Sequence, residues 1–203
     1  NNNSQSDVRA MSALSVWFPQ LREASLAVAY MEVRGSTTIS GSNFFPLSNP
    51  CKSMRERCLV ADAFQIFGAS WHDESSSTSH YGFVTGGGSS SASPMVSGII
   101  ALLNQAFPNH TAEMIVDRLL ASANNSWFTP SGNTTFTTHG NSIKHGYHNI
   151  WGHGFPDAYA ALSPIVSDGN PRTSLYIDSG EDLNSKNDMN HHSYLGSRLE
   201  VPY

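Results

Sequence analysis

The chain has 203 residues, enough to bury a core in one domain, and 39% of them are hydrophobic, which excludes wholesale disorder. Only 13% are charged and the net charge is -5, and since no basic stripe appears, nucleic acid is excluded as the main partner. Serine, threonine, asparagine and glycine supply over a third of the chain, an uncharged composition that is typical of secreted proteins.

The start of the chain carries no recognisable targeting signal. It opens on Asn1 without a basic stretch followed by an apolar one, so we expect either a processed start or a piece of something longer. No apolar run approaches roughly 18 residues, so no membrane span is expected in this chain. Residues 1–16 are polar and are predicted to form a loop.

Three strands are predicted in the first half. The apolar run L-A-V-A-Y-M-E-V at 26–33 is typical of a strand covered on both faces, as in a parallel sheet. Shorter strands are predicted at 58–61 and 64–67, followed by a polar loop over 72–80. The two cysteines of the chain lie in this half, at positions 51 and 58.

The spacing of Cys51 and Cys58 differs from the C-x-x-C of redox and zinc sites. A disulfide closing this small loop is sterically reasonable and would contribute roughly 2–3 kcal/mol by the loop-entropy relation. A composition typical of an oxidising compartment favours the disulfide, and two unrelated thiols are the alternative.

Two helices are predicted after the Gly/Ser-rich stretch at 85–91. The first runs from about Ser91 to Gln105, is apolar on almost every face and is expected to be buried all round, with Pro94 in its first turn. The second runs from about Thr111 to Ala123. Its predicted buried stripe comprises Ile115, Val116, Leu119, Leu120 and Ala123.

The remainder is predicted to be mostly loop. Residues 124–150 are expected to be a loop, and 151–162 a turn followed by a short helix. Residues 164–203 show no clear period and are predicted to be a polar extension or linker, which leaves 1–163 as one domain.

Residues 88–94 read G-S-S-S-A-S-P, which places a serine just before a buried helix. A serine nucleophile needs a base to remove its proton and donors to stabilise the oxyanion that it creates. The free N–H groups of a helix N-terminus supply such donors, and the glycines before it allow close approach. The alternative is a plain Gly/Ser linker ahead of a core helix.

This segment resembles the active-site serine segment of subtilisin-like proteases, the subtilases. Residues 107–123 resemble the helix that follows in that family, and 151–162 resemble its closing G-x-G-x-x-D-A-x-A-A helix. L-S-N-P-C at 47–51 with C-L-V-A at 58–61 is similar to a stretch of autotransporter-type bacterial subtilases. F-P-Q-L (18–21) and L-A-V-A-Y (26–30) fit the same branch, and the resemblance implies a secreted or bacterial cell-surface protein.

The resemblance implies roles for six residues. Ser90 matches the nucleophile, and Gly88, Ser89, Ala92 and Pro94 match its surrounding motif, with Ser89 where the family usually has threonine. Asn1 is a candidate for the family's oxyanion-hole asparagine, although the glycine that often follows is missing here; a polar run is the alternative. The implied fold is α/β, the carboxy-terminal half of a subtilase, with a mostly parallel sheet flanked by helices and a central serine helix.

The triad is the main departure from the family. Subtilases order it as Asp, His and Ser along the chain, so both partners of Ser90 should lie upstream, and neither motif is present. D-S-G at 178–180 follows the serine and is interpreted as coincidence. His72 and His80 would break the order too, and His139, His145, His148 and His153 are expected to be exposed loop residues rather than metal ligands.

The sequence therefore predicts a serine endopeptidase that acts on a protein or peptide substrate without a cofactor or metal. This chain alone is expected to be inactive, because its upstream half would carry the base and the aspartate. The alternative is a non-catalytic cell-surface or binding module on a degenerate subtilase scaffold, since a fold does not establish an activity.

Overall fold

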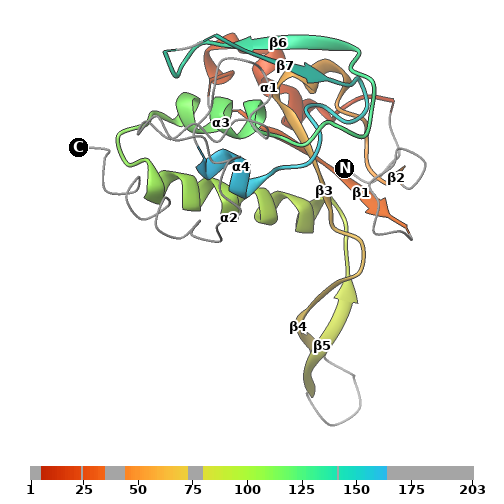
Figure 1. Cartoon of the computed structure of the whole chain (residues 1–203). Coiled ribbons are helices and arrows are strands. Elements are labelled where there is room, and N and C mark those ends of the chain that lie inside the picture. The colour runs from red at the N-terminus through yellow and green to blue at the C-terminus, as the bar shows by residue number, and fades with distance from the viewer. Residues whose placement is uncertain (1–5, 24, 35–43, 73–79, 141, 164–203) are drawn as a thin grey trace, which may run out of the picture.

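A computed structural model describes most of the chain (Figure 1). The described residues are 6–23, 25–34, 44–72, 80–140 and 142–163. Asn1 and the predicted extension at 164–203 lie outside them. Within the described part, no helix is long and apolar enough to cross a membrane.

The N-terminal segment forms short helical turns where a loop was expected. The 3-10 helices η1 (Ala10–Ala13) and η2 (Pro19–Leu21) flank α1 (Leu14–Trp17). Ala13 and Ser15 are buried, so tertiary contacts fix turns that the polar composition of this segment does not predict.

A three-stranded sheet with the order β2-β1-β3 lies at the centre. β1 (Ala27–Val33) pairs in parallel with β3 (Cys58–Asp62) and antiparallel with β2 (Phe44–Pro46). Thus the strands predicted at 26–33 and 58–61 are confirmed, and the β1–β3 pair is the parallel pairing among the four that the described residues form.

A long hairpin follows β3, formed by β4 (Ile66–His72) and β5 (His80–Gly86). The strand predicted at 64–67 therefore begins two residues later, because Gln65 takes a positive φ of 53° and turns the chain. Figure 1 shows this hairpin extending away from the rest of the described chain. Of the loop predicted at 72–80, residues 73–79 lie outside the described ranges.

Helices α2 (Ser89–Ala106), α3 (Ala112–Ala121) and α4 (Ala158–Leu162) pack against one another. The predicted cap of α3 is present, since the N–H of Met114 donates to the hydroxyl of Thr111 at 3.2 Å. The predicted buried stripe of this helix is confirmed as well. Asp157 caps α4 in the same way, accepting from the N–H of Ala160 at 2.9 Å.

Two expectations for the serine helix are wrong. It begins at Ser89, so Pro94 lies inside α2 rather than in its first turn. Pro94 has no N–H and cannot donate the helical bond to the carbonyl oxygen of residue 90. The helix is also not buried all round: its buried residues are Ala92, Val96 and Leu103. It packs on β1, β3, α3 and α4, and the described residues leave another face of it uncovered.

The loop predicted at 124–150 contains a second hairpin. β6 (Gly132–Phe136) and β7 (Ile143–Tyr147) pair antiparallel, with Phe136 opposite Ile143. Phe136 and Ile143 are buried, so the hairpin is held by an apolar pair at one end while its other residues are largely polar. A short strand of threonine, histidine and lysine gives little apolar alternation for prediction.

The core consists of two clusters on either side of the sheet. One gathers residues of β3, α2 and α3, including Leu59, Val96, Leu103, Leu119 and Leu120. The other lies around β1 and includes the predicted disulfide between Cys51 and Cys58, whose Cα atoms are 5.9 Å apart. The 3-10 helix η4 (Lys52–Arg57) fills the loop that this disulfide closes.

The two glycines that flank His153 allow residues 152–154 to lie directly against neighbouring backbone. Gly152 and Gly154 have φ values of 56° and 96°. A Cβ on Gly152 would lie 2.1 Å from the carbonyl oxygen of Cys58, and one on Gly154 would lie 2.1 Å from that of Asn124. Both positions therefore exclude a side chain on two counts.

We expect Gly154→Ala to lower the free energy of unfolding by about 3 kcal/mol or more, because backbone strain and overpacking add. Gly140→Ala is the matched control: its φ of 79° is also positive, but nothing lies within 4 Å of the added Cβ. It should cost about 1 kcal/mol. Equal losses in urea unfolding would show that close packing at Gly154 contributes nothing.

Candidate active site

Ser90 lies in the first turn of α2, with its side chain exposed. Gly88 precedes the helix with φ 128° and accepts from the N–H groups of Ser91 and Ala92 at 2.9 and 3.0 Å. The first N–H groups of a helix have no partner within it and carry a partial positive charge. The sequence thus places a hydroxyl at a helix end suited to stabilise an anion.

The Gly-rich approach fixes this helix end against β3. The N–H of Gly88 donates to the carbonyl oxygen of Ala63 at 3.1 Å. A Cβ on Gly87 would lie 2.3 Å from the same oxygen, so only glycine fits there. These contacts hold the start of α2 against the end of β3 in space, although the β4–β5 hairpin separates the two in sequence.

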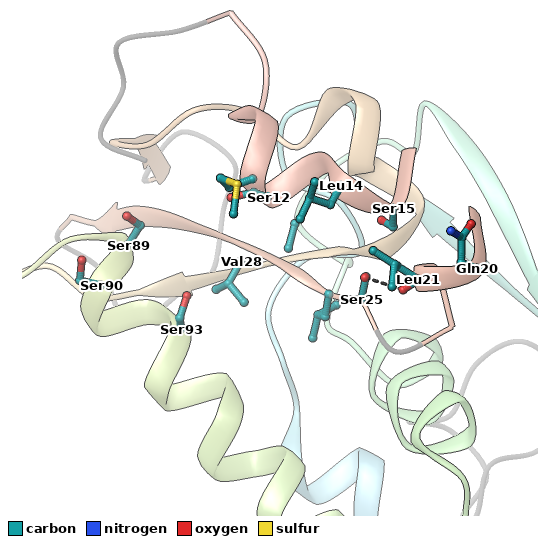
Figure 2. A pocket seen from close by; sticks show the side chains of 13 residues that line it. Ser12, Leu14, Ser15, Gln20, Leu21, Ser25, Val28, Ser89, Ser90 and Ser93 are labelled. Atoms are coloured by element: carbon teal, nitrogen blue, oxygen red, sulfur yellow. Dashed lines mark hydrogen bonds between the residues drawn. The ribbon is translucent and has the colours of Figure 1, made fainter. Parts of the chain in front are cut away.

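An open cavity of about 650 Å³ lies beside Ser90. Figure 2 shows Ser89, Ser90 and Ser93 on the α2 side, opposite Ser12, Leu14 and Leu21 of the N-terminal turns. The lining combines polar hydroxyl and amide groups with apolar side chains. It comprises Met11, Ser12, Leu14, Ser15, Gln20, Leu21, Ser25, Leu26, Ala27, Val28, Ser89, Ser90 and Ser93. The contribution of the N-terminal turns has no signal in the sequence.

The structure brings together part of the predicted motif. Ser89 and Ser90 both line the cavity, Gly88 caps the helix before them, and Ala92 is completely buried beneath them. Pro94 is exposed on the helix surface. Asn1, the predicted second oxyanion donor, lies outside the described residues.

No base lines the described part of this cavity. Its lining residues include no histidine, aspartate, glutamate or lysine. A serine hydroxyl keeps its proton without such a neighbour. Within the described residues, therefore, Ser90 has an electrostatic environment for an oxyanion but no group in the cavity that would activate it.

Two histidines expected to be exposed are buried instead. His145 on β7 and His153 before α4 have 4% and 0% of their surface exposed. They are not among the residues that line the cavity beside Ser90. The sequence signal for the burial of His153 was its position between two glycines, because glycines that admit close backbone contact bury the residue between them.

A search of curated proteins gave no significant match. Among solved structures, the self-cleaved protease domain of PatA is 23% identical, with a TM-score of 0.41, over 68% of this chain and 40% of that chain. The prenylagaramide maturation protease PagA is 19% identical, with a TM-score of 0.41, over 68% and 41%.

The serine protease MycP1, an essential component of the type VII (ESX-1) secretion system, is also similar. It is 23% identical, with a TM-score of 0.39, over 68% of this chain and 30% of that chain. The chain thus spans less than half the length of each of these three structures. A family model described as the subtilase family matches residues 1–154. Because this match covers most of its length, the chain belongs to the subtilase family.

Proposed function

We propose that the whole protein is a serine endopeptidase with Ser90 as nucleophile, and that this chain is the carboxy-terminal half of its catalytic domain. The observation that carries the proposal is the exposed hydroxyl of Ser90 at the N-terminus of α2, beside a cavity of about 650 Å³. Membership of the subtilase family supports the reaction class.

In the proposed reaction, Ser90 Oγ attacks a peptide carbonyl carbon and forms an acyl-enzyme, which water then hydrolyses. The negative charge on the former carbonyl oxygen is stabilised by the N–H of Ser90 at the helix end and by the amide of Asn1. A histidine of the upstream half takes the serine proton and delivers it to the leaving amine, and an aspartate orients that histidine.

The uncovered face of α2 supports the proposed upstream half. Met95 and Leu102, two apolar side chains of this helix, are 44% and 51% exposed. The β4–β5 hairpin likewise exposes Phe67 and Phe83, each at 69%. Exposed apolar surface on this scale is typical of an interface. We propose that the missing half covers both and adds parallel strands to the central sheet.

The remaining assignments rest on composition and on the disulfide. Cys51 and Cys58 are joined, and disulfides persist mainly in oxidising compartments. This supports a secreted or bacterial cell-surface protein, and the resemblance of residues 47–51 and 58–61 is the ground for proposing the autotransporter branch. Residues 1–163 would then belong to the peptidase domain, and 164–203 would lead out of it as a polar extension.

The proposal is tested with the full-length protein and an unstructured protein substrate. We expect hydrolysis by the full-length protein, and an upstream sequence containing an Asp-Ser/Thr-Gly motif followed by a His-Gly-Thr-His motif. Absence of both motifs together with absence of hydrolysis would favour a non-catalytic binding module on the same scaffold.

A further inference from the structure

The imidazole rings of His145 and His153 meet in the interior, and we refer to them as the histidine pair. Their Nδ1 atoms lie 2.8 Å apart. The Nε2 atom of His145 lies 3.0 Å from the carbonyl oxygen of Ala123, and that of His153 lies 3.1 Å from the carbonyl oxygen of Glu56. All four ring nitrogens are therefore within hydrogen-bond distance of a partner.

Counting protons gives the charge that the pair needs if all three contacts are to be hydrogen bonds. A carbonyl oxygen only accepts, so each Nε2 must donate, which uses the single proton that each neutral imidazole carries. The Nδ1 atoms would then face each other with two lone pairs at 2.8 Å. One further proton turns this repulsive contact into a hydrogen bond. All three contacts are satisfied only by three protons, which leave one positive charge.

A metal ion does not account for this contact. Zinc–nitrogen bonds are about 2.0–2.1 Å long, so two nitrogens on one tetrahedral ion lie about 3.3 Å apart. The Nδ1 atoms are closer than that, at 2.8 Å. Within the described residues, moreover, no group of three or more His, Cys, Asp or Glu side chains is placed to hold a metal.

The groups around the pair oppose a second positive charge, that is, a fourth proton on the two rings. Burial, the charge of His145 and the charge of Arg57 on η4 together lower the pKa of His153 to about 3. Arg57 is itself paired with Asp117 of α3, at 3.0 Å. From β7 the ring of Tyr147 faces His153 at 6.0 Å, and from β6 that of Phe136 lies at 5.5 Å. From β3, the carbonyl oxygen of Cys58 accepts from the backbone N–H of His153 at 2.8 Å.

We propose that the histidine pair is a buried binding site for a single proton, and that this proton links four segments. One of them is the stretch before α4 that carries His153. Glu56 belongs to the loop closed by the Cys51–Cys58 disulfide. Ala123 lies just beyond α3, and His145 is on β7. The shared proton completes the chain of contacts from the disulfide loop through both rings to the end of α3.

The sign of the pH dependence follows from the protons bound in each state. Above about pH 6.5 both histidines are neutral in the unfolded chain, whereas the native pair keeps one proton. The free energy of unfolding therefore falls as pH rises, until the pair gives up its proton. The unfolding equilibrium constant increases by up to tenfold per pH unit over this range. Between about pH 3 and 6.5 the unfolded chain binds two protons against one, so stability falls with decreasing pH.

The direct test is nitrogen NMR of the full-length protein labelled with ¹⁵N-histidine, at pH 7. We expect both Nε2 atoms of the pair to be protonated, and one proton to show coupling to the Nδ1 atoms of two different rings. An unprotonated Nε2 on either ring, or the absence of a shared Nδ1 proton, would overturn the proposal. This measurement needs no variant and does not depend on peptidase activity.

A second test compares urea unfolding between pH 6.5 and 8.5 for the full-length protein and His145→Gln. The unfolding constant of the unmodified protein should rise with pH by up to tenfold per unit more than that of the variant. His139→Gln is the matched control, because His139 Nε2 also lies 3.0 Å from a carbonyl oxygen, that of Met114, outside the pair. Equal slopes in the unmodified protein and His145→Gln would contradict a native-state proton.

Discussion

Ser90→Ala in the full-length protein is expected to lower the rate of peptide hydrolysis by about 10⁶-fold, the loss that follows removal of a triad nucleophile. The physical reason is that alanine offers no oxygen to form the acyl-enzyme, while the helix end that stabilises the oxyanion remains. Turnover of an unstructured protein substrate, followed at saturating concentration, measures the effect.

Neighbouring serines provide the controls for this result. Ser91 and Ser93 lie in the same turn region of α2, and Ser93 lines the same cavity. Ser91→Ala and Ser93→Ala should each keep activity within about tenfold of the unmodified protein, since neither is placed at the nucleophile position of the motif. A Ser90→Ala variant that retains activity, or a Ser91→Ala variant that loses it, would move the nucleophile elsewhere.

The isolated 203-residue chain should self-associate and hydrolyse no substrate. Leu102 of α2 is 51% exposed, and Phe67 and Phe83 of the β4–β5 hairpin stack with ring centroids 5.0 Å apart while both remain 69% exposed. Apolar patches of this kind and unpaired strand edges drive association in water. Size-exclusion chromatography across a range of concentrations measures the association.

Leu102→Glu separates this surface from general insolubility. In the isolated chain it should shift the elution towards the monomer. In the full-length protein it should lower activity by about 10²-fold or more, because it would place an unpaired carboxylate in the proposed interface. Tyr159→Glu, at a side chain of α4 that is 52% exposed, should do neither. An isolated chain that is monomeric at high concentration would argue against a missing half.

The elements that sequence alone predicts are those whose signal is local. The apolar runs of β1 and β3 gave both strands, and the capping threonine with its apolar stripe gave α3. Glycines, serines and an apolar run likewise placed Ser90 at the start of α2. Each of these patterns reports the preferences of adjacent residues, which tertiary packing then reinforces.

What the sequence did not predict depends on contacts between distant segments. The buried face of α2 is decided by which elements cover it, so an apolar composition cannot say that Leu102 remains exposed. The β6–β7 hairpin is held at Phe136 and Ile143 while most of its other side chains are polar. His145 and His153 come together only on folding. In the sequence, single histidines in a Gly-rich stretch are typical of an exposed loop.

The Ser90 assignment is tested most directly by covalent labelling. The full-length protein and the isolated chain are each treated with a fluorophosphonate, which reacts with an activated serine, and the adduct is mapped by mass spectrometry. We predict one adduct on Ser90 in the full-length protein and none in the isolated chain, where no base lines the described part of the cavity. An adduct on another serine, no adduct in the full-length protein, or equal labelling of Ser90 in the isolated chain would contradict the account.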